Sequence, residues 1–122
     1  PGRIVEPKQV TIVNGVEVRL EKVVTTPSET AVTLCFNNKN PAYDDWTALP
    51  TLIINWQRYE AGLISQGRAS NPNCQIAYFN AVLYNETGNW QLQVKELIGL
   101  KRNTPGPSLQ IDGPWNFRFE MP

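Results

Sequence analysis

The chain contains no histidine. Histidine is the commonest general base, the commonest metal ligand and the usual partner of a serine or cysteine nucleophile. A structural zinc site needs four ligands, mostly cysteine and histidine, and the chain has only two cysteines. No glycine-rich phosphate loop stands between a predicted strand and a predicted helix. We therefore expect a protein that is not an enzyme and that has no catalytic residues, no cofactor and no metal site.

An excess of charge of one sign is also missing. Lys and Arg together number 11, and so do Asp and Glu. A nucleic acid or an anionic membrane surface would need a basic excess, so neither is an expected partner. No apolar run approaches the length of a bilayer span, so the chain is not expected to be membrane-spanning itself. Its 122 residues, of which 41% are hydrophobic, fit a single domain over residues 1–122.

The strongest pattern that is present lies at the C-terminal end. A turn at Asp112-Gly113-Pro114 precedes a run in which large apolar side chains alternate with polar ones. The apolar set is Trp115, Phe117, Phe119 and Met121, and the polar set is Asn116, Arg118 and Glu120. Strict alternation is typical of a strand with one buried face. Such a wide apolar ridge needs an opposing sheet to cover it, so we predict that this segment is the closing strand and the last layer of the core.

Shorter alternating segments fill most of the remaining chain. Residues 1–7 are predicted to be an irregular lead-in. Asn14-Gly15 stands between two alternating runs, which predicts a hairpin with a type I′ turn. Residues 37–50 are rich in Asn, Asp and Pro and predict a long loop with one short helical turn at residues 44–48. The expected strands are residues 8–13, 16–24, 30–36, 52–57, 75–84, 90–98 and 115–121, with a further short edge strand at 63–66.

This arrangement indicates an all-β fold. About seven strands at regular spacing, separated by turn signals and without a long helix, favour a two-sheet Ig-like β-sandwich, with a small β-barrel as the alternative. A break in the alternation at Glu21-Lys22 predicts a bulge or a strand that changes sheets. The residues predicted to face the core include Val10, Ile12, Val18, Leu20, Val32, Leu34, Phe36, Trp56, Trp90, Leu92 and Val94.

The two cysteines are Cys35 and Cys74. The alternation places Cys35 on the outer face of its strand, where its thiol can reach Cys74 at the end of the loop that precedes the next strand. We favour a disulfide between them. It would close a loop of roughly 40 residues and stabilise the fold by about 4 kcal/mol in the chain-entropy model. Two unrelated buried thiols are the alternative.

Three aromatic side chains, Tyr43, Trp46 and Tyr59, stand in or beside polar loops. Exposed aromatic rings can stack on a sugar or anchor a protein partner, so these three are the candidate contact residues of a binding site. For Trp46 we favour a position that caps the open end of the sandwich, because Trp is rarely left fully exposed. The acidic residues stand mostly in loops and at outward strand positions, so a pair of catalytic carboxylates is only a remote alternative.

Two segments resemble a known family. Residues 16–36, VEVRLEKVVTTPSETAVTLCF, and residues 111–122, IDGPWNFRFEMP, are similar to bacterial extracytoplasmic Ig-like domains of unknown function. These domains occur on the outer side of membrane-anchored proteins, some of them linked to anti-sigma factors. The shared elements are a strand that ends in a Thr-Pro-Ser turn, an apolar return strand and a closing Gly-Pro-Trp-x-Phe-x-Phe pattern. The resemblance implies a location outside the cytoplasm, where disulfides persist, and it implies no catalytic residue and no ligand.

The function expected from these observations is that of a non-enzymatic interaction or spacer domain on the bacterial cell exterior, anchored to a membrane in the full-length protein. Its partner would be another protein or a neighbouring domain of the same chain. A carbohydrate-binding module that uses the loop aromatics is the alternative function. A small carboxylate-dependent hydrolase is the remote one.

Overall fold

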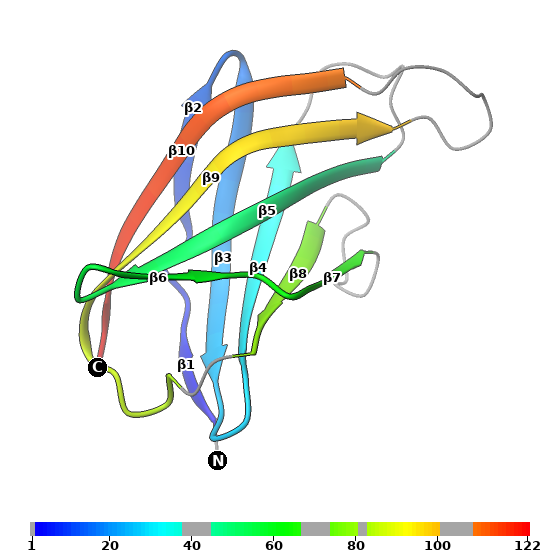
Figure 1. Ribbon diagram of the computed structural model, residues 1–122. Coiled ribbons are helices and arrows are strands. Elements are labelled where there is room, and N and C mark those ends of the chain that lie inside the picture. The colour runs from blue at the N-terminus through cyan, green and yellow to red at the C-terminus, as the bar shows by residue number, and fades with distance from the viewer. Residues whose placement is uncertain (1, 38–44, 67–73, 81–82, 101–108) are drawn as a thin grey trace.

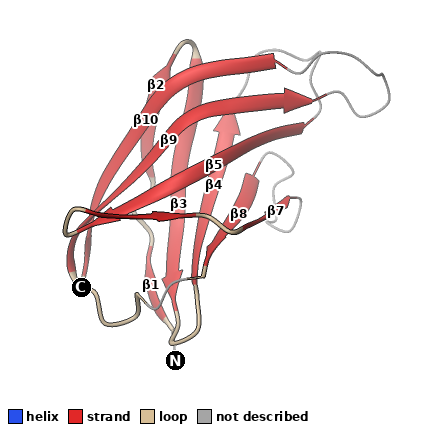
Figure 2. Ribbon diagram, in the orientation of Figure 1, coloured by secondary structure: helices blue, strands red, loops and turns tan. Residues whose placement is uncertain are grey.

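The computed structural model describes residues 2–37, 45–66, 74–80, 83–100 and 109–122. Ten strands lie in these ranges, and no helix does (Figure 2). The prediction of about seven strands was too low, because short strands form in segments where little alternation is visible. The strands are β1 (Arg3–Val5), β2 (Gln9–Val13), β3 (Val16–Thr25), β4 (Thr30–Asn37), β5 (Asp45–Ile54), β6 (Gln57–Glu60), β7 (Leu63–Gln66), β8 (Cys74–Phe79), β9 (Gly88–Leu100) and β10 (Leu109–Met121).

Backbone hydrogen bonds join these strands into two antiparallel sheets (Figure 1). The six-stranded sheet has the order β1-β3-β4-β8-β7, and β2 pairs with another part of β3. The four-stranded sheet has the order β10-β9-β5-β6. The sheets face each other as two layers and do not close into a barrel, which confirms the predicted two-sheet sandwich. The chain passes from one sheet to the other between β4 and β5, between β6 and β7, and between β8 and β9.

The core lies between the two layers and follows the predicted alternation closely. Trp115, Phe117, Phe119 and Met121 of β10 are all buried, as expected for the last layer of the core. The Trp115 indole Nε1 donates a hydrogen bond of 3.0 Å to the carbonyl oxygen of Val16, which links β10 to β3. The predicted bulge is present as a register shift between Leu20 and Lys22. The predicted hairpin also forms, and Asn14 and Gly15 both have positive φ.

β10 begins earlier than predicted, so Asp112-Gly113-Pro114 lies inside the strand and not before it. The Gly113–Pro114 peptide bond is cis, and the pairing with β9 shifts register between Asp112 and Trp115. A Cβ atom at position 113 would lie 2.6 Å from the Trp115 ring and 2.8 Å from the carbonyl oxygen of Val94. Glycine is therefore required here, because a bulge brings the strand backbone against a core tryptophan.

The N-terminal segment differs from the prediction in two ways. The expected lead-in at residues 1–7 contains β1, which pairs with the end of β3. Val10 and Ile12 of β2 do not face the core, since 43% and 64% of their surfaces are exposed. The opposite face of β2 turns toward β10, which lies beside it in Figure 1. Two polar side chains on that face donate hydrogen bonds to carbonyl oxygens of β10, Gln9 to Arg118 at 2.5 Å and Thr11 to Asn116 at 3.0 Å. Asn14, in the turn that follows β2, donates a third, of 2.6 Å, to Asp112.

These three hydrogen bonds explain why the predicted face was wrong. Alternation shows which residues share a face, but not which of the two faces turns inward. Here the polar face is the inner one, because β10 is an edge strand whose free carbonyl groups need donors. The side chains of β2 satisfy them without adding a backbone ladder, so this edge of the sandwich is covered.

The expected loop at residues 37–50 is also partly wrong. Residues 38–44 lie outside the described residues, but β5 starts at Asp45 and extends through the region predicted to be a helical turn. Trp46 of β5 is paired with Gly99 of β9, and its ring covers that glycine. A Cβ atom at position 99 would lie 2.9 Å from the ring, so glycine leaves the space in which Trp46 is buried. The interpretation of Trp46 as an inward side chain is therefore confirmed.

A buried glutamine joins the two sheets. Gln75 of β8 lies on the inner face of the six-stranded sheet and has no exposed surface. Its Oε1 accepts a hydrogen bond of 3.0 Å from the backbone N–H of Ala48, and its Nε2 donates one of 2.8 Å to the Ala48 carbonyl oxygen. The partner lies in β5 of the other sheet, next to a register shift between Ala48 and Pro50. One side chain thus satisfies both polar groups of a residue at an irregular point of the strand.

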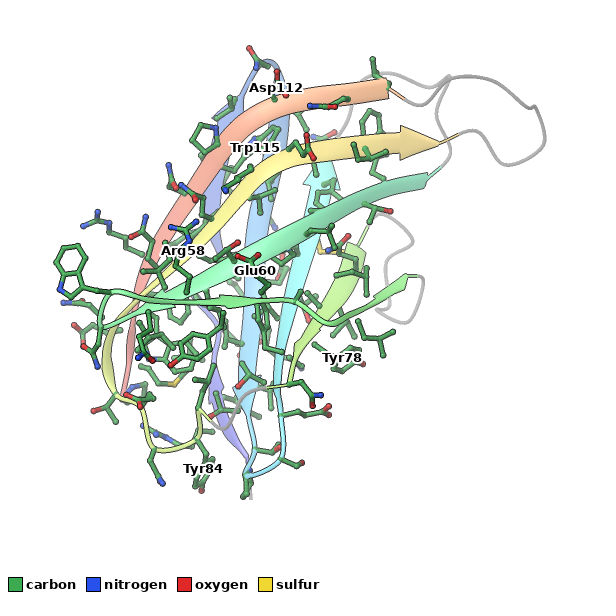
Figure 3. The ribbon with its side chains drawn as sticks, viewed as in Figure 1. Arg58, Glu60, Tyr78, Tyr84, Asp112 and Trp115 are labelled. Atoms are coloured by element: carbon green, nitrogen blue, oxygen red, sulfur yellow. A yellow bond between two sulfur atoms is a disulfide. The ribbon has the colours of Figure 1, made fainter. Side chains whose placement is uncertain are left out.

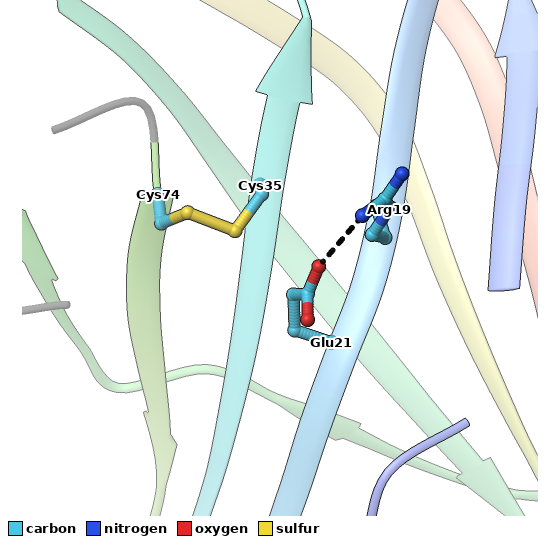
Figure 4. A network of polar contacts seen from close by, with 4 residues as sticks. All are labelled: Arg19, Glu21, Cys35 and Cys74. Atoms are coloured by element: carbon cyan, nitrogen blue, oxygen red, sulfur yellow. Dashed lines mark hydrogen bonds and ion pairs between the residues drawn. A yellow bond between two sulfur atoms is a disulfide. The ribbon is translucent and has the colours of Figure 1, made fainter. Parts of the chain in front are cut away.

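Cys35 and Cys74 form a disulfide, as predicted (Figure 4). Cys35 lies on the outer face of β4, as the alternation indicated. Cys74 is the first residue of β8 and stands directly opposite Cys35 in the β4–β8 ladder. The bond therefore joins two neighbouring strands across a sheet, whereas the sequence had suggested a bond from a strand to a loop. Figure 4 also shows the ion pair between Arg19 and Glu21, 3.3 Å apart on the same outer face.

We expect reduction of this disulfide to lower the free energy of unfolding by about 2–4 kcal/mol, because the bond constrains a long loop of the unfolded chain. The double variant Cys35→Ser/Cys74→Ser should show the same loss in urea denaturation. Mass spectrometry should find the native protein two hydrogens lighter than the reduced one. Ala31→Ser, on the same face of β4, is the control and should stay within about 0.5 kcal/mol. Equal masses, or equal unfolding midpoints with and without reductant, would contradict the prediction.

Candidate functional site

The predicted aromatic contact residues do not form an exposed row. Tyr43 lies outside the described residues. Trp46 is buried, so its ring is not offered to a ligand. Tyr59 of β6 is half-buried and packs against the core, and its hydroxyl donates a hydrogen bond of 2.7 Å to Oε1 of Gln57. Among the described residues, Trp46 and Tyr59 therefore do not form an exposed aromatic binding surface.

Among the described residues, the exposed aromatic side chain is Trp56, which was wrongly predicted to lie in the core. It is 96% exposed, whereas the three other tryptophans, Trp46, Trp90 and Trp115, are 8%, 1% and 0% exposed. Ile54 pairs with Gln57 across the β5–β6 ladder, so Asn55 and Trp56 are the two residues of a tight hairpin turn. The apolar alternation of β5 continues through the turn in sequence, but the chain itself reverses there.

The backbone of this turn is unfavourable for tryptophan. Asn55 and Trp56 have φ values of +50° and +69°, the left-handed conformation that both central residues of a type I′ turn require. Asn tolerates this conformation, but a bulky residue there is uncommon and costs about 1–2 kcal/mol. The β2–β3 hairpin of the same chain meets the same demand with Gly15, at φ +76°. Neither turn geometry nor burial explains the tryptophan at position 56.

Trp56 borders a groove of about 440 Å³ on the outer side of the four-stranded sheet. The turn between β5 and β6 supplies one wall, and residues of β9 and β10 supply the remainder. Its apolar side chains are those of Trp56 and Ile53, and Trp90 contributes to the lining. The polar lining residues are Asn55, Asn89, Gln91 and Arg118. Strand pairing fixes the floor, because Arg118 is opposite Gln91 and Gln91 is opposite Ile53.

The polar side chains of the groove are available to a ligand. Within the described ranges, the side chains of Asn55, Asn89, Gln91 and Arg118 have no hydrogen-bond or ion-pair partner. The groove lining contains no carboxylate, so its one charged group is the guanidinium of Arg118. These groups can bind and orient a polar molecule, but they include no pair of acids of the kind that glycoside hydrolysis uses.

The surface beside the groove is held by side-chain hydrogen bonds across the sheet. Arg58 of β6 donates one of 3.2 Å to Gln93, and Gln93 donates one of 3.2 Å to Asn116. Thr51 donates one of 2.8 Å to Glu60. Figure 3 shows Arg58 and Glu60 on β6, directed across the outer side of the four-stranded sheet. The polar surface therefore extends from the groove over the neighbouring strands.

A second hollow, of about 760 Å³, lies beside the β7 edge of the other sheet. Its lining includes Leu63, Ile76 and Tyr78, with Glu29 and Asn80 at its margin. Leu63 is largely exposed at this edge. Two neighbouring segments, residues 67–73 and 81–82, lie outside the described residues. The Trp56 groove is the stronger candidate, because a nearly fully exposed tryptophan borders it at a turn whose positive φ disfavours that residue.

Comparisons with protein-family models, with curated proteins and with solved structures found no match to this chain. In the part of the chain that the structure describes, no helix is long and apolar enough to cross a membrane. The same residues contain no group of three or more His, Cys, Asp or Glu side chains that could hold a metal ion.

The sequence contained a signal for the Trp56 turn that the alternation hid. Asn55 is a residue that accepts positive φ, and it stands between two segments that can pair with each other. Leu52, Ile54 and Trp56 nevertheless continue one alternating pattern, which favoured a single long strand. Arg118 was correctly predicted to face outward, but nothing in the sequence indicated that it would lie with Gln91 and Asn89 beside one exposed ring.

Proposed function

We propose that this domain is a non-enzymatic interaction module that works outside the cytoplasm, and that the Trp56 groove is its contact surface. The observation that carries the proposal is the position of Trp56, which is exposed at a turn whose geometry disfavours it. A residue that is unfavourable for the fold and nearly fully exposed is expected where function requires it. The role is binding, because the groove brings together one aromatic ring and several polar side chains without catalytic acids.

The location outside the cytoplasm rests on two supports. The Cys35–Cys74 disulfide is compatible with an oxidising compartment. The resemblance of residues 16–36 and 111–122 to bacterial extracytoplasmic Ig-like domains points the same way, and it makes a membrane-anchored full-length protein part of the proposal. As part of the same proposal, the two-sheet sandwich is related to Ig-like domains.

An exposed tryptophan is a suitable centre for a contact surface. Tryptophan is enriched among the residues that dominate binding energies, because a large rigid ring is desolvated at little cost in side-chain entropy. At Trp56 nearly the whole ring remains to be buried by a ligand. The strands under the groove are fixed by pairing on both sides of β9 and β5, so little further ordering is needed on binding.

The variant Trp56→Gly tests this proposal. Glycine adopts positive φ freely, so the free energy of unfolding should stay unchanged or rise by up to about 1 kcal/mol. Binding of the purified domain to the cell-envelope fraction of the source organism, measured by sedimentation, should weaken at least about tenfold. The substitution therefore separates folding from binding. If Trp56 had only a structural role, replacing it would not weaken binding while the stability stayed unchanged or rose.

Ile12→Ala is the matched control, since it removes an exposed apolar side chain from the six-stranded sheet. It should leave envelope binding unchanged. Equal binding by wild type and Trp56→Gly would show that the Trp56 groove is not the contact surface, and it would overturn the proposal.

A further inference from the structure

We infer that the ligand of the Trp56 groove is a glycan, bound through a pyranose ring that stacks on the indole of Trp56. This inference rests on the proposed function and adds the chemical class of the ligand. The original carbohydrate-binding alternative placed the site on Tyr43, Trp46 and Tyr59. The site inferred here uses a different tryptophan and a different part of the surface.

The groove matches the two kinds of surface on a sugar. A pyranose ring has a face of C–H groups, and the flat indole of Trp56 offers an apolar face of similar size. It also has a rim of hydroxyl groups, each of which both donates and accepts hydrogen bonds. The side-chain amides of Asn55, Asn89 and Gln91 carry donors and acceptors side by side, and they surround the same groove. The guanidinium of Arg118 adds a planar set of donors for paired oxygens.

The size and composition of the groove favour a glycan over a protein partner. A volume of about 440 Å³ lies within the range of small-ligand sites. Stable protein interfaces cover a much larger area, with an apolar centre made by several side chains. Around Trp56 the apolar part is limited to the indole and Ile53, and the remaining lining side chains that face the groove are polar. A nucleic acid would need a cluster of basic residues, and Arg118 is the one charged lining residue.

The surface beside the groove can hold more than one sugar unit. Strand pairing places Arg118, Gln91, Ile53 and Arg58 in one row across the sheet. The next row on the same face contains Asn116, Gln93, Thr51 and Glu60. Hydrogen bonds from Arg58 to Gln93 and from Gln93 to Asn116 fix the side chains that cross these rows. An oligosaccharide can therefore extend from Trp56 across fixed polar side chains.

The experiment measures tryptophan fluorescence during titration with three hexasaccharides: β-1,4-linked glucose, β-1,4-linked N-acetylglucosamine and α-1,4-linked galacturonate. Trp56 is the one strongly exposed tryptophan of the four, so acrylamide quenches it selectively. Saturable protection from acrylamide by at least one hexasaccharide is the expected result. Because Trp56 is itself the fluorescent reporter, the affinities of the variants are measured by isothermal titration calorimetry with the same hexasaccharides. The affinity should fall at least tenfold in Trp56→Gly and in Gln91→Leu, and it should be partly kept in Trp56→Tyr. Arg118→Leu should weaken the galacturonate oligomer more than the neutral ones.

The control variant is again Ile12→Ala, which should bind like the wild type. No protection by any of the three hexasaccharides overturns the glycan inference. A second outcome also overturns the glycan inference. Envelope binding could depend on Trp56 but survive periodate oxidation of sugar diols and be lost after protease treatment, and the partner is then a protein. In that case the proposed contact surface stands and only its ligand class is wrong. Envelope binding that is indifferent to Trp56 overturns both.

Discussion

Trp115→Ala is expected to lower the free energy of unfolding by about 3–5 kcal/mol, the usual cost of truncating a large buried aromatic side chain. Trp115 has no exposed surface, and its ring fills the space above Gly113 that no other residue type leaves open. The change also removes the hydrogen bond from the indole Nε1 to the carbonyl oxygen of Val16. That carbonyl then lacks its partner in the core, which adds to the cost of the cavity.

Urea denaturation, followed by far-UV circular dichroism, measures this loss. The matched control is Trp56→Ala, which makes the same chemical change at a side chain that is 96% exposed. It should cost less than about 1 kcal/mol. Similar losses for the two variants would contradict the assignment of one tryptophan to the core and the other to the surface. Phe117→Ala provides a second buried position, and we expect it to behave like Trp115→Ala.

The part of the fold that was predictable is the part set by local alternation. In β3 and in residues 115–121 of β10, the apolar side chains of the inward face are buried, because a strand has two faces and a sandwich covers one of them. The turn at Asn14-Gly15 was predictable for a similar reason, since both residue types accept positive φ. The outward position of Cys35 came from the same alternation, and it led to the correct disulfide.

The errors arose where the outcome depends on a distant partner. Val10 and Ile12 alternate as well as any core strand, yet the side chains that face inward are those that donate hydrogen bonds to β10, roughly one hundred residues away. The exposure of Trp56 depends on whether β5 continues or folds back on itself, and alternation is the same in both cases. A site that combines this turn with residues of β9 and β10 is therefore invisible until the strand order is known.

Gln75 is a further residue whose importance comes from a distant strand. In sequence it is a polar residue at the start of a strand with two mostly apolar faces. In the structure it is fully buried and bonds to both backbone groups of Ala48 in the opposite sheet. A polar side chain in this position is tolerated because all of its principal groups are satisfied. These two hydrogen bonds also fix β5 relative to β8 at the irregular point of β5, which lies between Trp46 and Leu52 along the strand.

Gln75→Leu should therefore destabilise the domain, although it replaces a polar core residue by an apolar one of similar size. The N–H and C=O groups of Ala48 would both lose their partner in a dry interior, and each such loss costs about 1–3 kcal/mol, so the pair should cost about 2–6 kcal/mol.

The comparison variant is Gln110→Leu, which alters an exposed glutamine of β10 that bonds to Asp112, and it should change stability by less than about 0.5 kcal/mol. Hydrogen exchange supplies an independent measurement, since the Ala48 amide should be protected in the wild type and should exchange much faster in Gln75→Leu. A contradicting result would be a Gln75→Leu variant that is as stable as the wild type and still protects the Ala48 amide. The backbone of β5 would then have another hydrogen-bond partner at its bulge, and Gln75 would not hold the two sheets together at that point.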